Sequence, residues 1–415
     1  MSFISPPTIP SHLPPKLSIG MFIWNWVTMA TEGEPYEDLE AAVAGLRQRG
    51  FNAVRVDAGL NWCFRTDGRP RGEMAFGPWI PGYRDNLSSV NARGGGRHDV
   101  LRRVERLMEL ARQYDVYVIL TSWEYQDSSW LVADPAIRAE VMAVPQAERL
   151  MHLARQHDRL LGVLKAKGLD RHIAFVEVHN EPDCSLFPQA EEGRRLHEEA
   201  IAFLRDGHGD ILVSADYTSH NPAVVPGNSQ VYDQHLYVGS RLYFQELYEK
   251  TIWAKSFDPA NPRNIPLLDR LLKDTIVPWD RFMAAAGGIR EWWRPIMWLY
   301  YNLDNARFDE WIGELYADQR DVIDANARQV MGADAAEAAR RGIPAVCDEG
   351  GYFYPPLGSR FEVTQPGLGL FERMIDLAIE YGYWGFMPST YCGPEHPLWN
   401  EVDWLQRHNG RFLGS

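Results

Sequence analysis

Residues 173–182 read Ile-Ala-Phe-Val-Glu-Val-His-Asn-Glu-Pro. Such an apolar run, with a helical pattern before it and polar residues after it, is typical of a strand that is buried on both faces. Seven further short apolar runs share this setting: 17–23, 53–57, 116–120, 211–214, 231–235, 343–348 and 383–387. Eight strands separated by helical stretches predict a (β/α)8 barrel, an α/β fold that takes up the whole chain, residues 1–415.

The composition of the chain fits a single large barrel and restricts its partners. Of the 415 residues, 45% are hydrophobic and 24% are charged, as is usual for folded proteins. The 42 Lys and Arg residues against 56 Asp and Glu residues give a net charge of −14. Because nucleic acids and anionic membranes attract clustered cations, neither is expected as a partner. The 15 Trp, 18 Tyr and 17 Phe residues favour a site for flat, partly apolar ligands such as sugars.

The sequence carries no visible sign of export or of a membrane segment. Residues 1–8 lack the basic and apolar regions of a secretory signal, and no apolar run approaches the ~18 residues of a membrane span. We therefore expect a cytoplasmic protein with reduced thiols. No zinc site is expected, because the four cysteines are far apart in the sequence: Cys63, Cys184, Cys347 and Cys392.

One interval between the predicted strands is much longer than the others. About 100 residues, 238–340, separate the sixth strand from the seventh, although one crossover helix would suffice there. We expect this segment to form an insertion subdomain over the mouth of the barrel; the alternative is an extra helical layer that packs elsewhere. The insertion contains a dense group of aromatic residues: Trp292, Trp293, Trp298, Tyr300, Tyr301 and Trp311.

Candidate site residues lie at the carboxyl ends of the predicted strands, where barrel enzymes place their active sites. They come from the second, fourth, sixth and seventh strands: Arg55, Asn180, Glu181, His235, Tyr237 and Glu349. This combination resembles a clan of retaining barrel glycosidases that includes the cellulases and mannanases of glycoside hydrolase family 5. The similarity extends from Arg55 to Glu349 and therefore covers the barrel as a whole.

The resemblance implies a retaining β-glycosidase that works by double displacement without a cofactor or a metal. Glu181 would be the acid and base, and Glu349 the nucleophile. Two carboxyl groups about 5–5.5 Å apart, with pKa values pushed apart, are what this chemistry needs. The resemblance further implies that Arg55 and Tyr237 hold Glu349, and that Asn180 donates a hydrogen bond to the sugar 2-hydroxyl.

Two positions depart from the family pattern, and both shape the sugar subsite. Members of family 5 commonly carry a histidine at the end of the third strand, where this chain reads Thr-Ser-Trp-Glu-Tyr-Gln-Asp over residues 121–127. They also place a tryptophan at the end of the eighth strand, whereas Trp384 comes early in that strand. The sugar itself is therefore not predicted beyond a gluco or manno configuration. Aromatic candidates for stacking on a sugar are Trp24, Trp26, Trp123, Tyr125, Trp130 and Tyr391.

Alternatives stay open beside this prediction. Exo action on short oligosaccharides or glycosides is favoured because the insertion could wall off one end of the cleft, and endo action on a β-glycan is the alternative. A metal-dependent sugar isomerase could use Glu177, Asp216, His235 and Glu349 as ligands, although strand alternation predicts that Glu177 faces away from the mouth. A sugar-binding barrel without catalysis is the third reading.

Overall fold

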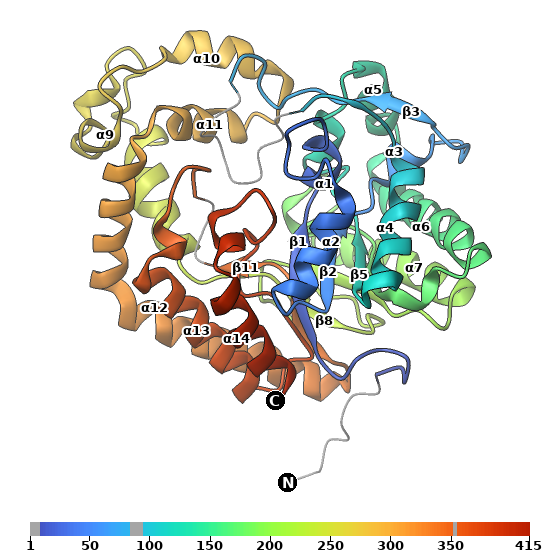
Figure 1. Cartoon of the computed structure of the whole chain (residues 1–415). Coiled ribbons are helices and arrows are strands. Elements are labelled where there is room, and N and C mark those ends of the chain that lie inside the picture. Colours follow the sequence, from blue (N-terminus) through green and yellow to red (C-terminus); the bar gives the residue numbers. More distant parts are fainter. Residues whose placement is uncertain (1–8, 84–93, 352–354) are drawn as a thin grey trace.

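Eight parallel strands form a closed barrel at the centre of the molecule (Figure 1). The computed structural model describes residues 9–83, 94–351 and 355–415. The (β/α)8 barrel predicted from the sequence is confirmed. In their order around the barrel the strands are β1 (Leu17–Phe22), β2 (Ala53–Asp57), β5 (Tyr117–Thr121), β6 (Ile173–Glu177), β7 (Val213–Tyr217), β8 (Tyr232–Gln234), β10 (Ala345–Cys347) and β12 (Gly385–Phe386).

Each predicted strand overlaps an observed one, and β7 differs most from its prediction. It was expected over 211–214 and instead covers Val213–Tyr217. The backbone N–H of Ile211 donates to the His208 carbonyl at 3.0 Å, so this apolar residue belongs to the turn before the strand. The second half of β7 contains Asp216, which is buried inside the barrel. A search for apolar runs therefore ends before the strand does.

Long helices surround the barrel. Their first turns are fixed where an aspartate accepts a backbone N–H, as Asp38 does from Ala41 and Asp99 from Arg102. The long helices are α2 (Leu39–Gln48), α4 (Val100–Tyr114), α6 (Arg149–Ala166), α7 (Ala190–Gly207), α12 (Asn305–Arg341), α13 (Gln365–Glu380) and α14 (Val402–Leu413).

A second pair of parallel strands continues two barrel strands toward the mouth. β9 (Leu236–Tyr237) follows β8 and pairs with β11 (Gly350–Gly351), which follows β10. A Cβ atom at Gly350 would lie 2.8 Å from the Leu236 carbonyl oxygen, so only glycine permits this close pairing. The pair therefore fixes the backbone on both sides of Glu349 and beside Tyr237.

Shorter elements follow the carboxyl ends of β1, β2 and β5. They are α1 (Asn25–Thr28), α3 (Leu60–Cys63), η1 (Ser128–Trp130) and α5 (Pro135–Met142), together with the antiparallel pair of β3 (Glu73–Ala75) and β4 (Arg97–Asp99). The remaining one-turn elements are η2 (Gln146–Glu148), η3 (Asp170–His172), η4 (Pro182–Cys184), η8 (Phe361–Val363) and η9 (Pro397–Asn400).

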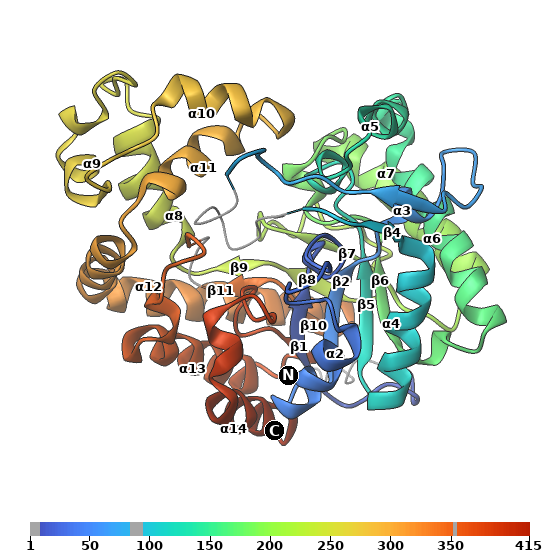
Figure 2. The same cartoon turned by 45° about the horizontal axis from the view of Figure 1, so that its top comes forward.

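All the secondary-structure elements in the segment between β9 and β10 are helices. In both views α10 and α11 lie at the same end of the molecule as α5, opposite α14 (Figures 1 and 2). The last helix of the segment, α12, packs against β8, β10 and α13 and so also serves as the barrel helix between β8 and β10. The other elements are α8 (Ser240–Tyr243), the π-helix η5 (Phe244–Ile252), η6 (Pro262–Asn264), α9 (Pro266–Leu271), α10 (Trp279–Ala285), η7 (Ala286–Gly288) and α11 (Trp293–Asn302).

The prediction about export rests on residues 1–8, which lie outside the described residues. Among the helices that are described, none combines the length and the hydrophobicity needed to cross a bilayer.

Candidate active site

The strand ends bring the predicted site residues into one buried cluster. Arg55 lies in β2, Glu181 follows β6, His235 lies between β8 and β9, and Glu349 lies between β10 and β11. All four side chains are buried. A carboxylate oxygen of Glu181, a ring nitrogen of His235 and a carboxylate oxygen of Glu349 lie within 4.8 Å of one another. Two carboxyl groups thus face each other at the carboxyl end of the barrel, with an imidazole beside both.

The Glu349 carboxyl group accepts hydrogen bonds at both of its oxygens. Arg55 Nη1 donates to Oε2 at 2.7 Å, and the Tyr237 hydroxyl donates to Oε1 at 2.7 Å. These are the two residues that the family resemblance assigns to holding this carboxylate. Both donors favour the ionised form, which is the form that can act as a nucleophile.

The Glu181 carboxyl group is also held at both oxygens, but by different donors. His235 Nδ1 lies 2.8 Å from Oε1, and Gln126 Nε2 donates to Oε2 at 2.9 Å. The backbone N–H of Glu181 donates to Asp216 Oδ2 at 2.9 Å. The side chain is therefore held from two neighbouring loops, and the backbone of Glu181 is held from β7.

Glu181 has a left-handed backbone conformation, with φ 44° and ψ 63°. This conformation is uncommon for a residue with a Cβ atom and persists only where the surroundings enforce it. Here Ser185 Oγ donates to the Glu181 carbonyl at 2.8 Å, and Gln189 Nε2 donates to the Pro182 carbonyl at 3.0 Å. Asp183 in turn accepts three hydrogen bonds from Thr218 and Ser219. These hydrogen bonds hold Glu181 in its strained backbone conformation, and such strain is often found at functional sites.

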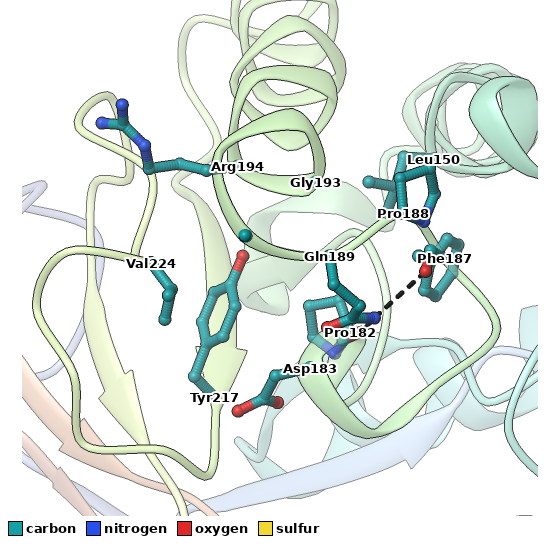
Figure 3. Close-up of a pocket in the computed structure, with 11 residues that line it drawn as sticks. Leu150, Pro182, Asp183, Phe187, Pro188, Gln189, Gly193, Arg194, Tyr217 and Val224 are labelled. Carbon is teal, nitrogen blue, oxygen red and sulfur yellow. Dashed lines mark hydrogen bonds between the residues drawn. The ribbon is translucent and has the colours of Figure 1, made fainter.

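A pocket borders the turn that follows Glu181. Figure 3 shows Pro182, Asp183, Gln189 and Tyr217 among the residues that line it. Neither Glu181 nor Glu349 is among its lining residues. The pocket therefore borders the support of Glu181 rather than the two carboxyl groups.

Four buried carboxyl groups surround the guanidinium of Arg55. Its nitrogens lie 2.7 Å from Glu349, 2.8 Å from Glu177, 3.0 Å from Asp348 and 3.2 Å from Asp216. The expectation that Glu177 faces away from the mouth is wrong for its side chain, which points into the barrel toward Arg55. β6 ends at Glu177, so strand alternation cannot be continued to the residues beyond it. The Arg55 guanidinium, a permanent cation, therefore lies against Glu177, Asp216 and Glu349, which are three of the four ligands considered for an isomerase.

Among the described residues, two groups of side chains have the spacing that a metal ion would need. One is Glu181, His235 and Glu349, and the other is Asp233, His235 and Asp348. Oxygen and imidazole ligands of this kind suit several divalent metals. His235 belongs to both groups, and its Nδ1 is engaged with Glu181 by a hydrogen bond of 2.8 Å. A metal in either group would therefore have to compete with this contact or share the same imidazole.

The charges in the cluster determine where its protons lie. Burial opposes a charge on His235, but the carboxylates of Glu349, Asp348 and Glu181 outweigh it and raise the pKa of His235 well above its usual value. Burial would raise the pKa of Glu181, yet the hydrogen bonds from His235 and Gln126 lower it. The pKa of Glu349 is raised, because burial and the neighbouring Glu181 outweigh His235, Arg55 and Tyr237. These opposite directions place the proton of the Glu181–His235 pair on the imidazole.

Asn180 lies beside Arg55, and its amide has a further neighbour that the sequence did not predict. Arg55 Nη2 donates to Asn180 Oδ1 at 2.8 Å, and Asn180 Nδ2 donates to Gln126 Oε1 at 2.6 Å. Gln126 therefore contacts both Asn180 and Glu181. The signal that could have identified it is its place in residues 121–127, the stretch that departs from the family pattern.

The aromatic candidates for sugar stacking are mostly packed inside the protein. Trp123 lies 4.7 Å from the Arg55 guanidinium, and Trp24 packs against Trp79 and Trp123. Tyr391 packs against His396. The exposed aromatic residues are found elsewhere, with Trp292 of the insertion 41% exposed. Of the sequence candidates, the buried ones are Trp24, Trp26, Trp123, Tyr125 and Tyr391, while Trp130 is partly exposed.

Solved structures with the same barrel include several glycosidases. A candidate glycoside hydrolase from Parabacteroides distasonis aligns with a TM-score of 0.67 and 16% identity, over 96% of this chain and 94% of that one. A family 5 mannosidase from Rhizomucor miehei aligns with a TM-score of 0.50 and 12% identity, over 97% and 94% of the two chains. An exo-β-1,4-mannosidase from an Opitutaceae bacterium has the same TM-score and identity, over 99% of this chain and 62% of that one.

At these identities the likeness concerns the fold. No protein-family model matches the sequence, and no curated protein matches it. The chain is therefore a (β/α)8 barrel similar in fold to glycoside hydrolases of family 5, with a buried pair of glutamates at the carboxyl end of its strands.

Proposed function

We propose that this protein is a retaining β-glycosidase in which Glu181 is the acid and base and Glu349 is the nucleophile. The observation that carries the proposal is the short separation of the two carboxyl groups, whose oxygens approach within 4.8 Å. Retaining glycosidases need about 5–5.5 Å between the carboxyl groups, whereas inverting enzymes need about 6.5–9.5 Å to admit a water molecule. The similarity in fold to family 5 mannosidases adds support.

In the first step, an oxygen of Glu349 attacks the anomeric carbon and the bond to the leaving oxygen breaks. Arg55 and Tyr237 donate hydrogen bonds that favour the ionised form of Glu349 and orient it for this attack. Glu181 gives a proton to the leaving oxygen at the same time. In the second step, Glu181 takes a proton from water, the water oxygen attacks the anomeric carbon, and Glu349 leaves as a carboxylate.

The proton for the first step is carried by a residue that is hydrogen-bonded to Glu181. It lies on His235 Nδ1, 2.8 Å from Glu181 Oε1. Transfer along this hydrogen bond converts Glu181 into the acid and leaves a neutral imidazole. When Glu349 forms its bond to the sugar, it becomes a neutral ester. The negative charge that favours a proton on His235 is then smaller. The second step then returns a proton from water to the pair.

We further propose exo action on short gluco- or manno-configured oligosaccharides or glycosides. The helical segment between β9 and β10 reaches across to the loop after β5, where Trp293 Nε1 donates to Asp127 at 2.9 Å. This contact supports a wall at one end of the cleft. The mannosidase activity named for two proteins of similar fold favours testing β-mannosides first.

The test is hydrolysis of a panel of aryl β-glycosides, with the configuration of the first product followed by NMR. Wild type should release a β-configured sugar. Glu349→Gln should abolish turnover, and azide should restore activity to Glu349→Ala with an α-glycosyl azide as product. Glu181→Ala should lose activity mainly on substrates with poor leaving groups, and the exposed Glu192→Ala is its control. An α-configured first product, or loss of activity in EDTA, would overturn the proposal.

A further inference from the structure

Gln126 connects the two residues that would meet the substrate oxygens. It follows β5 in a tight turn in which its backbone N–H donates to the Trp123 carbonyl at 2.9 Å. From there its carboxamide accepts from Asn180 at 2.6 Å and donates to Glu181 at 2.9 Å. Residue 126 is only partly buried, whereas both carboxyl groups are buried.

The chemistry of an amide gives this contact a direction. An amide nitrogen can donate a hydrogen bond but cannot accept a proton. Gln126 Nε2 therefore favours the ionised form of Glu181 and fixes Oε2, while Oε1 faces His235. Glu181 therefore receives its proton at Oε1, while the amide of Gln126 holds Oε2.

The loop of Gln126 is itself held by the helical insertion. Arg290 Nη1 donates to the Gln126 carbonyl at 3.0 Å. The adjacent Asp127 is buried and accepts from the Trp293 indole at 2.9 Å. Burial, which the Arg290 charge and this hydrogen bond oppose, raises the pKa of Asp127 to about 6. A chain of contacts therefore runs from the insertion through residues 126 and 127 to Glu181.

We propose that Gln126 is a positioning residue that orients the Glu181 carboxyl group and ties it to the helical insertion. This inference rests on the proposed glycosidase function. It gives the insertion a role in proton transfer in addition to any role as a wall of the cleft. The role requires no contact between the insertion and the reacting atoms.

The experiment compares the pH dependence of kcat/KM for a substrate with a poor leaving group. Its alkaline limb reports the group that must carry the catalytic proton. Gln126→Leu removes the donor, so the limb should move up by about one pH unit, which is the expected effect of one hydrogen bond to a charged group. Gln126→Glu puts a second carboxyl group there and should move it further. On a dinitrophenyl glycoside, which needs little acid assistance, both variants should keep glycosylation rates within about two-fold of wild type.

Paired variants test the link to the insertion. Trp293→Phe keeps the ring but removes the donor to Asp127, so it should move the limb in the same direction by a smaller amount. Trp292→Phe makes the same change at an exposed neighbour, and Gln146→Leu makes the Gln126 change at an exposed site; neither should move the limb. An unchanged limb in both Gln126 variants of an active enzyme would overturn the inference alone. An inactive wild type would overturn the proposed function, and the inference with it.

Discussion

Replacing Arg55 by methionine should destabilise the fold strongly, because it leaves several buried carboxyl groups without their cation. The guanidinium lies 2.7–3.2 Å from four carboxylates, and its side chain is fully buried. Removing one partner of a buried ion pair costs about 3–5 kcal/mol. Unfolding entropies of about 2.1 cal/mol/K per residue give about 0.9 kcal/mol/K for 415 residues. The expected fall in Tm is therefore about 3–6 °C at pH 7.

Differential scanning calorimetry of three proteins measures this effect. Arg69→Met is the matched control, because Arg69 pairs with Asp67 at the surface with 77% of its side chain exposed. Such pairs contribute little, so its Tm should stay within about 1 °C of wild type. If Arg55→Met also stayed within 1 °C, the carboxyl groups around Arg55 would have to be neutral in the folded protein, and its role as their counter-ion would be refuted.

The pH dependence of the same variant gives an independent check. Without Arg55 the orphaned carboxyl groups have folded-state pKa values above their unfolded ones. The folded variant then binds more protons than its unfolded chain, so lowering the pH stabilises it relative to wild type. The difference in Tm between the variant and wild type should accordingly narrow as the pH falls from 7 to 5.

Three further variants test separate parts of the structure. His235→Asn removes the proton store and should lower kcat on poor leaving groups about 10²–10³-fold, with much less effect on a dinitrophenyl glycoside. Tyr237→Phe removes a donor to ionised Glu349 and should move the acid limb of kcat/KM to higher pH. Burial, opposed by a hydrogen bond from Ser389, raises the pKa of Glu362 to about 8. Its neutral form therefore stabilises the fold at low pH, and this stability is lost as the pH rises from about 4.5 to 8. Glu362→Gln should melt progressively higher than wild type as the pH approaches 9.

The barrel and its central residues could be predicted because each strand carries its own local signal. An apolar run identifies the strand, and the residue that follows it must lie at the mouth. Glu181 and Glu349 are 168 positions apart in the sequence, yet this rule places both at the carboxyl end of one barrel. β7 was misplaced by the same rule, because Ser214 and Asp216 interrupt its apolar pattern inside a polar barrel centre.

The contacts that depend on loop conformation could not be predicted. The departure of residues 121–127 from the family pattern draws attention to Gln126, but the contacts of its carboxamide with Asn180 and Glu181 depend on how this stretch turns. Likewise the link from Trp293 to Asp127 joins helix α11 to the loop after β5, across 166 positions of sequence. A residue pattern reports which side chains lie near a strand end, but not which of them touch.

The balance of charge in the barrel centre has a consequence for catalysis. Two cations, Arg55 and His235, lie among six buried carboxyl groups: Glu177, Glu181, Asp216, Asp233, Asp348 and Glu349. Such an excess of buried negative charge is costly, so several of these groups must hold protons at neutral pH. Burial, with the charges of His235 and Arg55 opposing it, raises the pKa of Asp216 to about 7. Asp216 Oδ2 lies 3.2 Å from His235 Nε2 and accepts the Glu181 N–H. Protons are therefore held within hydrogen-bond reach of the acid on the protein side, away from the substrate.

If the protein supplies the proton in this way, kcat on a poor leaving group should not depend on buffer concentration at constant pH. In Asp216→Asn, where this neighbour of His235 can no longer titrate, added buffer acid should accelerate turnover, and an equal lack of response in both proteins would contradict the idea of an internal supply.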